Sequence, residues 1–302
     1  MKKQQLSIHV PKKKIPQDDS QFGDYLAGLI DGNGHFSNIG QCIIAFHSQD
    51  VSHAYFIKTK IGYGSIRPVY DKQAVVLIIT GQKGLRRVAD LIHNKLRHQT
   101  RISQFNSFIA DRHQIIQGYT VINNEINWES YWFSGFFDAD GYFALRLVFR
   151  PTSANRLKIA KAEKHIVNSD TGKAMVEKDS KQTLMSRARG KVRLQIKLDQ
   201  KTKILLDSFQ NFFGGYLAYR KSQDTYYYQS TSFNDFWKVL KYFDSFSLQS
   251  SRRYLIYRLM RKAYLIVQNN AHFTPEGFEK LKGLYSRIHK QSEENRKENE
   301  MI

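Results

Sequence analysis

The sequence predicts an α+β protein built from two similar halves. Two stretches carry this prediction, YLAGLIDGNGHF at residues 25–36 and WFSGFFDADGYF at residues 132–143, which align without a gap at a spacing of 107 residues. After each stretch the same order of strand and helix patterns follows, so each motif is expected to open an equivalent unit. With 302 residues and 41% hydrophobic content, the chain can bury a core in each half.

The first half is expected at residues 21–118, after a basic arm at residues 1–20. Pro11 and Pro16 oppose helix in the arm, and Asp18, Asp19 or Ser20 offers an N-cap for the first motif helix. The remaining patterns predict a hairpin within 36–49, a helix at 51–61, strands at 62–70 and 73–80, and helices at 85–96 and 102–118.

A linker at 119–128 leads to the second half at 129–270. Its patterns predict strands at 143–150 and 191–198, a helix at 202–213, strands at 216–221 and 225–231, and helices at 233–243 and 252–267. An insertion at 151–190 predicts a long hairpin arm or a loop that orders on a partner. A last helix, capped at Thr274, and a polar tail are expected within 271–302.

Charge points to a polyanionic partner. Lys and Arg number 47 against 27 acidic residues, a net charge of +20. Nucleic acid is the first partner predicted and an anionic membrane the second, although no run of 18 apolar residues exists. Cys42 is the single cysteine, which excludes an intramolecular disulfide and predicts a reducing, intracellular location. Lys12 to Lys14 are read either as a targeting signal or as part of an arm lying on phosphate.

The motifs themselves suggest a metal site. Gly28 and Gly135 would let two helices approach closely and bring their C-terminal ends together. Asp140 would then lie near Asn33, and converging oxygen ligands on a basic protein suggest Mg²⁺ acting on a phosphodiester. For one copy alone, the simpler interpretation is that Asp-small-Asp-Gly ends a helix. The presence of two paired copies favours a metal site.

The two motifs resemble the paired signatures of the LAGLIDADG homing endonucleases, in the form with both halves on one chain. The resemblance implies two pseudo-symmetric αββαββα halves, with the motif helices packed at the centre and antiparallel sheets forming a saddle over DNA. It also implies hydrolysis of both strands with Mg²⁺, or another divalent cation such as Mn²⁺ or Ca²⁺. The implied catalytic and metal positions are Asn33 and Asp140, with the carbonyls of Gly32 and Ala139 as further ligands.

Asn33 departs from that pattern, because an amide carries no charge and cannot act as a base. Three explanations compete: a deliberate Asp-to-Asn change that traps a complex, a natural strand-biased nickase, or a chain that has lost cleavage. The intact remainder of the motif favours the first.

Other residues of the site follow from the same resemblance. A basic residue is implied at the start of each half's last helix, which gives Arg101 and either Arg252 or Arg253; solvated or phosphate-anchoring arginines are the alternative. Asp31 and Asp138 are expected to cap backbone groups at helix ends, with support of the metal ligands or direct ligation as further possibilities.

Strand patterns predict the DNA-reading face. In KVRLQIKL, polar Lys191, Arg193, Gln195 and Lys197 alternate with an apolar face. Arg146 and Arg150 follow the same rule. The weaker candidates are Gln41, Arg67, Lys72, Arg220, Lys221, Gln223, Tyr226, Tyr228 and Gln229.

The sequence therefore predicts a monomeric, sequence-specific DNA endonuclease acting on a long asymmetric double-stranded site. The alternatives are an intron RNA maturase and a DNA-binding protein without cleavage. Family habit and a composition rich in Lys, Ile, Tyr and Phe suggest an organelle, such as the mitochondrion.

Overall fold

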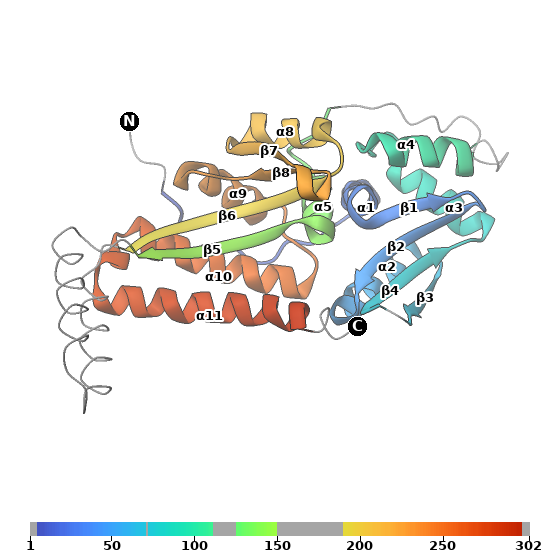
Figure 1. Cartoon of the computed structure of the whole chain (residues 1–302). Coiled ribbons are helices and arrows are strands. Elements are labelled where there is room, and N and C mark those ends of the chain that lie inside the picture. Colours follow the sequence, from blue (N-terminus) through green and yellow to red (C-terminus); the bar gives the residue numbers. More distant parts are fainter. Residues whose placement is uncertain (1–4, 71, 111–124, 150–189, 298–302) are drawn as a thin grey trace, which may run out of the picture.

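The fold is a pair of antiparallel sheets placed on either side of two central helices, as Figure 1 shows. The computed structural model describes residues 5–70, 72–110, 125–149 and 190–297. Each sheet has four strands, in the orders β1-β2-β4-β3 and β5-β6-β8-β7. The α+β class and the duplicated order are confirmed, whereas Arg150 and almost all of the predicted insertion lie outside the described residues.

The first half follows the predicted order. Its elements are α1 (Asp19–Asn33), β1 (Gly34–Ser37), β2 (Gln41–His47), α2 (Val51–Ile61), β3 (Ser65–Val69), β4 (Ala74–Ile79), α3 (Gln82–Ile92) and α4 (Gln99–Phe105), which continues as a π-helical turn at Asn106–Ala110. The Asp18 carboxylate caps α1 by accepting from the Gln21 backbone N–H at 2.8 Å. Gly62, with φ of 84°, ends α2 in the left-handed region that glycine adopts without strain.

The second half repeats this order and adds a helix. Its elements are α5 (Trp132–Asp140), β5 (Tyr142–Phe149), β6 (Gly190–Gln200), α8 (Lys203–Phe213), β7 (Tyr216–Arg220), β8 (Thr225–Gln229), α9 (Phe233–Ser245), α10 (Ser251–Gln268) and α11 (Pro275–Lys297). Ser232 and Asp235 form a capping box at the start of α9. Within the described residues, no helix is long and apolar enough to cross a membrane.

Helices α1 and α5 pack through reciprocal glycines. A Cβ on Gly28 would lie 1.9 Å from the Trp132 carbonyl oxygen, and a Cβ on Gly135 would lie 1.9 Å from the Tyr25 carbonyl oxygen. Only a residue without a side chain allows this approach. The prediction that the motif helices cross side by side is therefore confirmed.

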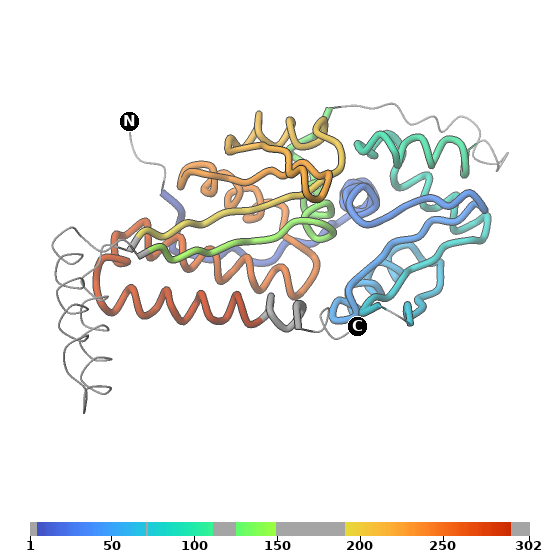
Figure 2. Tube along the Cα trace, in the orientation of Figure 1, coloured from blue at the N-terminus to red at the C-terminus, as the bar shows by residue number. Residues whose placement is uncertain are grey.

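The N-terminal arm docks on the second half before it enters the first, and Figure 2 traces this path in blue. Leu6 is buried, and its backbone N–H and C=O both bond to the Gln268 side chain, at 2.7 and 3.1 Å. Buried Arg261 donates to the carbonyls of Ser7 and His9. This part of the arm is therefore held by α10, and Lys13 extends the contact by donating to the Gln249 carbonyl at 3.0 Å.

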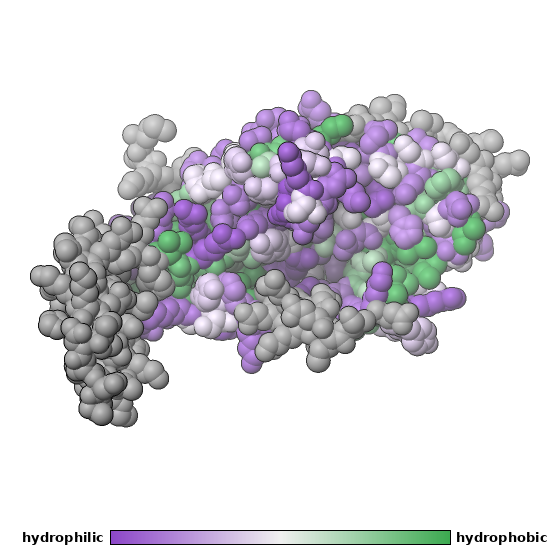
Figure 3. Space-filling model, in the orientation of Figure 1, coloured by the Kyte–Doolittle hydropathy of each residue, from purple (hydrophilic) through white to green (hydrophobic). Residues whose placement is uncertain are grey.

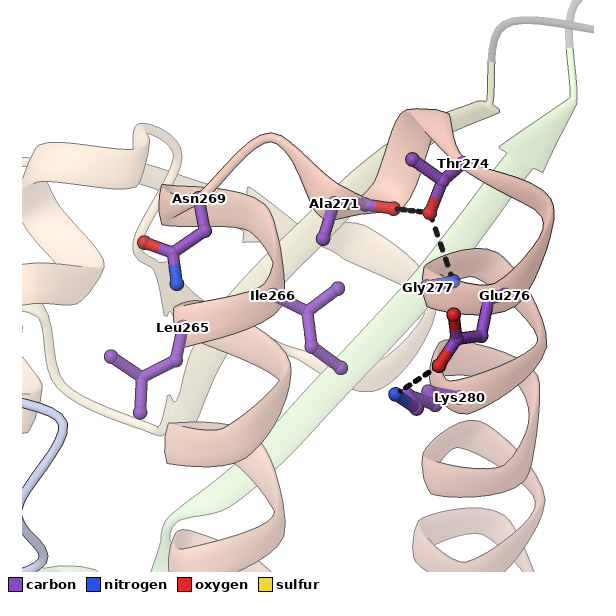
Figure 4. A pocket seen from close by; sticks show the side chains of 8 residues that line it. All are labelled: Leu265, Ile266, Asn269, Ala271, Thr274, Glu276, Gly277 and Lys280. Carbon is purple, nitrogen blue, oxygen red and sulfur yellow. Dashed lines mark hydrogen bonds and ion pairs between the residues drawn. The ribbon is translucent and has the colours of Figure 1, made fainter.

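Helix α11 packs along α10 and the edge strand β5. Its predicted cap is confirmed, because Thr274 Oγ1 accepts from the Gly277 backbone N–H at 3.1 Å. Between α10 and α11 lies a pocket of about 240 Å³, which Figure 4 shows with its lining side chains, including the Glu276–Lys280 ion pair. This pocket is separate from the motif helices.

Candidate active site and nucleic-acid interface

Asp31 holds the first half's last helix against the centre of the molecule. Its buried carboxylate accepts from the backbone N–H groups of Arg97 and His98, at 2.7 and 3.1 Å, where α4 begins. It also accepts from Trp132 Nε1 at 2.9 Å, a donor that belongs to the other motif helix. Burial nevertheless raises the pKa of Asp31 to about 6.

Asp138 makes the equivalent set of contacts in the second half. It accepts from the backbone N–H groups of Gln249 and Ser250, at 2.6 and 3.0 Å, where α10 begins. Tyr25, which occupies the same motif position as Trp132, donates its hydroxyl to Asp138 at 2.7 Å. Both aspartates thus bind backbone groups as predicted, although the helices that they cap are α4 and α10.

This shared capping identifies the equivalent arginines. Asp31 binds the two backbone groups that immediately precede α4, and Asp138 binds the two that immediately precede α10. Counting from these residues, Arg101 corresponds to Arg253. Of the two residues left open by the sequence, Arg253 is therefore the structural equivalent. Arg252 instead forms an ion pair with Asp50 at 2.8 Å.

Asn33 lies where the two motif helices end, beside the last turn of α5. Its Nδ2 donates to the Ala139 carbonyl at 3.1 Å, and Arg253 Nη2 donates to the same carbonyl at 3.2 Å. A Cβ on Gly32 would lie 2.4 Å from the Ala139 Cβ. The structure therefore brings Gly32, Asn33 and Ala139 together, with Arg253 of the second half beside them.

Asp140 is partly buried at the matching end of α5. Gln200, the last residue of β6, donates to its carboxylate. Burial raises the pKa of Asp140 to about 6, while the bond from Gln200 and the charge of Arg253 oppose this increase. Burial is the main cause that lowers the pKa of His98, and the Gln200 side chain opposes this change.

These residues fit one divalent cation better than two. A carboxylate whose charge is costly to bury, as at Asp140, gains from a nearby cation, and Mg²⁺ commonly uses one or two carboxylates together with waters and phosphates. On the Asn33 side, the amide donates to the Ala139 carbonyl and supplies no charge. Among the described residues, no three His, Cys, Asp or Glu side chains gather into a metal cluster.

A polar pocket of about 50 Å³ opens beside Asn33, and it is lined in part by residues from both halves. Its wall includes Asp50, Asp138, Arg252 and Arg253. His53 also lines the pocket; its Nε2 lies 2.8 Å from the Tyr25 hydroxyl oxygen, and burial lowers the pKa of His53 to about 4. His53 is therefore neutral at neutral pH.

The outer face of the second sheet, which we define as the face turned away from the buried strand residues, carries clustered positive charge. Arg146 on β5 lies directly opposite Arg193 on β6, and Lys197 lies opposite Tyr142, with Nζ 5.6 Å from the ring centroid. Lys191 extends the row. Like charges directly opposite each other destabilise a sheet, so this arrangement suits a face that meets an anion.

Three of the predicted DNA-facing residues have other environments. Gln195 is 6% exposed and donates to the Ser230 carbonyl at 3.1 Å. Tyr228 is fully buried and donates to the Gly214 carbonyl, so we withdraw it as a DNA contact. Because strand residues alternate, Tyr226 shares the inward side with Tyr228. Tyr227 lies on the outer side and was not among the residues predicted to contact DNA.

The remaining candidates lie near the ends of the sheets. Arg220 bonds Asp199 and Gln223 and stacks on Tyr227, with its guanidinium carbon 5.0 Å from the ring centroid. Gln229 lies opposite Lys197. In the first half, Arg67 on β3 and Lys72 in the following turn are exposed, and Gln41 begins β2 in a partly exposed position.

Sequence patterns did not predict the donors that bind the acidic motif residues. Gln200, Tyr25 and Trp132 each contact an acidic motif residue, yet their donors gave no local signal in the sequence. The one available signal was the position of Tyr25 and Trp132 at the start of both motifs.

Comparison with known proteins relates the chain to intron-encoded proteins. Residues 168–264 match the family described as LAGLIDADG endonuclease. The chain is 42% identical over 281 residues to an uncharacterized cox1 intron-2 protein of 37.2 kDa from Schizosaccharomyces pombe, covering 92% of this chain and 76% of the relative.

Two further relatives are longer proteins of which the chain spans a minor part. The chain is 28% identical over 164 residues to the intron-encoded RNA maturase bI4 of Saccharomyces cerevisiae, covering 50% of this chain and 24% of that protein. It is 23% identical over 268 residues to the probable intron-encoded endonuclease aI2 of Debaryomyces hansenii, covering 83% of this chain and 36% of that protein.

Among solved structures, the fold is similar to that of the LAGLIDADG meganuclease I-CpaMI bound to uncleaved DNA. The TM-score is 0.60, with 87% of this chain and 98% of that chain covered. Sequence identity is 14%, so this likeness concerns the fold alone.

Proposed function

The chain belongs to the LAGLIDADG homing endonuclease family, and we propose that it is a sequence-specific, divalent-metal-dependent DNA endonuclease acting as a monomer on a long asymmetric site. One observation supports the proposal above the others. The ends of α1 and α5 bring Asp140 and Asn33 to the junction of two sheets, one of which carries a row of cations on its outer face.

In this proposal Asp140 would hold a divalent cation together with the backbone carbonyls of Gly32 and Ala139 at the motif ends; the Ala139 carbonyl accepts from Asn33 and Arg253 and would exchange one of these donors for the ion. When bound, such an ion supplies Lewis-acid stabilisation of the charge that develops on phosphate oxygens. Gln200 orients the Asp140 carboxylate through its hydrogen bond. The buried environment of Asp140 favours cation binding because an uncompensated charge is costly there.

The arginines stabilise phosphate charge in the proposed reaction. Arg253 reaches the Ala139 carbonyl beside Asn33, and Arg101 occupies the equivalent position in the other half. A guanidinium placed near a scissile phosphate lowers the energy of the more negative transition state. The corresponding loss on removing one such donor is typically about 10²- to 10³-fold in kcat.

Asn33 weakens one of the two positions. Its amide donates to the Ala139 carbonyl at 3.1 Å, whereas an Asp carboxylate at the same place would have no hydrogen to donate and would repel that carbonyl oxygen in the absence of a cation. We therefore propose that this chain nicks one strand preferentially, and that Asn33→Asp gains cleavage of the other strand.

Strand-resolved cleavage tests the proposal. A duplex selected by binding to the chain is labelled on each strand in turn and incubated with Mg²⁺ and either the chain or its Asn33→Asp variant. The chain should cut one strand faster, and the variant should cut both. Unchanged cleavage of both strands in the variant would contradict the assigned role of Asn33, and full activity in Asp140→Asn would overturn the active site.

A second candidate is assistance of intron RNA splicing. Asn33 favours it, because RNA binding requires no second metal position, and one longer relative is named an RNA maturase. Competition between a selected DNA duplex and folded intron RNA discriminates between the two functions. Preferential retention of the RNA at matched salt would favour the maturase.

The intron-encoded relatives also support an organelle origin. We propose a mitochondrial location, which fractionation of cells that express the tagged chain would test.

A further inference from the structure

The outer face of the first sheet differs chemically from that of the second. In the middle of β2 and β4, the residues that alternate with the core are apolar: Ile43 lies opposite Ile78, and Ala45 lies opposite Val76, whereas Gln41 and His47 occupy the same face at the two ends of β2. All four are partly exposed, while their neighbours Cys42, Ile44, Phe46, Val75, Leu77 and Ile79 fill the core. The middle of these two strands is therefore apolar on both faces.

Polar groups border the apolar face rather than interrupt it. His35 on β1 lies opposite Ile43, and on β3 Ser65 lies opposite Ile78 and Arg67 opposite Val76. Figure 3 shows the apolar area as green among purple residues, on the side where Figure 1 places β2 and β4. We call Ile43, Ala45, Val76 and Ile78 the apolar quartet.

The equivalent strands of the second sheet present Arg193 and Lys197 from β6 and Gln229 from β8. The two halves share topology and lie on either side of the same motif helices, and we take the outer faces of both sheets together as the surface on which a duplex would lie. A duplex bound across this surface meets cations on one side and methyl groups on the other.

Thymine is the base that presents an apolar group in the major groove, its C5 methyl, whereas Arg and Lys pair best with guanine. Successive outward residues on one strand are roughly 6.6 Å apart, which is close to the rise of two base pairs. The two rows of the apolar quartet thus match two positions about two base pairs apart, with one base pair between them.

We infer that the apolar quartet reads a thymine-rich half-site through C5-methyl contacts, while the second sheet reads a half-site that contains guanine. This inference rests on the proposed DNA-binding function and names the sequence class of its target. It also explains why net charge is concentrated on one of two equivalent sheets.

Binding selection followed by removal of single methyl groups tests the inference. Duplexes recovered from a random library by the full chain should contain one half-site enriched in thymine and one enriched in guanine. Thymines of the first half-site are then replaced one at a time by deoxyuracil, which leaves the hydrogen-bonding edge intact. Each contacted methyl should be worth roughly a fourfold increase in Kd when it is lost, and uracil in the other half-site should have no effect.

Two variants assign the half-sites to the sheets. Val76→Thr keeps the side-chain shape at a partly exposed position. It should reduce the increase in Kd that deoxyuracil causes (the uracil effect) at one thymine of the thymine-rich half-site only. Arg193→Ala should relax preference in the guanine-containing half-site and leave the uracil effect in place. Circular dichroism of both variants checks that they fold.

Three results would overturn the inference. The first is a selected duplex whose affinity does not change with uracil in either half-site, a result that leaves DNA binding itself intact. The second is a free chain that dimerises until Val76→Thr makes it monomeric, because the apolar quartet would then be a protein interface. The third is recovery of no preferred duplex, which would overturn the proposed function as well.

Discussion

Asp140 is the residue whose ionisation should control the reaction. Burial raises its pKa to about 6, and metal ligation requires the carboxylate form. At limiting Mg²⁺, we predict that the single-turnover cleavage rate rises about tenfold per pH unit below pH 6 and levels off above it. A rate that is flat from pH 5 to 8 would contradict a role for this carboxyl.

The same shift predicts how stability depends on pH. Because the folded pKa of Asp140 lies above its value in the unfolded chain, its favourable contribution is present below about pH 4 and is lost as pH rises through about 6. In metal-free urea titrations, Asp140→Asn should therefore gain stability relative to the unmodified chain as pH rises from 4 to 7. Excess Mg²⁺ at pH 7 should shrink this difference.

Replacing Gly28 by alanine adds one carbon atom between the motif helices and so tests how closely they pack. A Cβ there would lie 1.9 Å from a backbone oxygen of the other helix, so Gly28→Ala must push the helices apart. Overpacking of this kind costs roughly 1–3 kcal/mol, occasionally more, and chemical denaturation would measure it. Gly283→Ala is the matched control, because a Cβ at this exposed position of α11 meets open space and should stabilise the helix by roughly 0.5–1 kcal/mol.

At the scale of elements, local pattern predicted most helices and strands because their signals lie within a few residues. Helix α2 was predicted with its observed ends, whereas Gly32 and Gly34 predict that the first motif helix stops at about Ile30, and α1 instead continues to Asn33. Packing against α5 overrides the glycine preference there. In β8, three successive tyrosines give no alternation from which the phase of the strand could be chosen, so Tyr227 was missed.

The site was predictable where the motif is repeated and unpredictable where it depends on distant chain segments. Asp140 and Asn33 follow from the aligned motifs. Gln200 becomes a partner of Asp140 only because β6 ends beside α5, a contact that tertiary structure creates. The arm illustrates the same limit, since its contacts with α10 join residues more than 250 positions apart in the chain.

Arg261 tests whether the arm is a structural part of the second half. It is 1% exposed and binds both Asp244 and two arm carbonyls, so Arg261→Met leaves these buried acceptors without a donor. Breaking a buried ion pair in this way typically costs roughly 3–5 kcal/mol. Arg258→Met, an exposed position on the same helix, should change stability by less than about 0.5 kcal/mol.

Protease sensitivity separates release of the arm from general destabilisation. In native conditions, Arg261→Met should be cleaved within the arm before the core is degraded, while Arg258→Met should resemble the unmodified chain. Equal protection of the arm in both variants would show that Arg261 does not hold it.

At the scale of the whole molecule, a net charge of +20 makes the free energy of unfolding depend on salt and on bound anions. Arg146 and Arg193 lie opposite each other on a sheet whose outer face also carries Lys191 and Lys197. Repulsion among these groups opposes folding in the absence of an anion and strengthens binding in its presence. Stability without DNA and affinity for DNA should therefore respond in opposite directions when one of these charges is removed.

Arg193→Ala provides that test. At low salt and without DNA, the variant should unfold at a higher urea concentration than the unmodified chain, and the difference should disappear as salt screens the repulsion. Its affinity for a selected duplex should fall, and the slope of log Kd against log salt should decrease by about one if the side chain contacts a phosphate. If it reads a base instead, the slope should change little while discrimination at one position is relaxed. A variant with lower stability at low salt and unchanged affinity would show that the row of cations serves the protein rather than DNA.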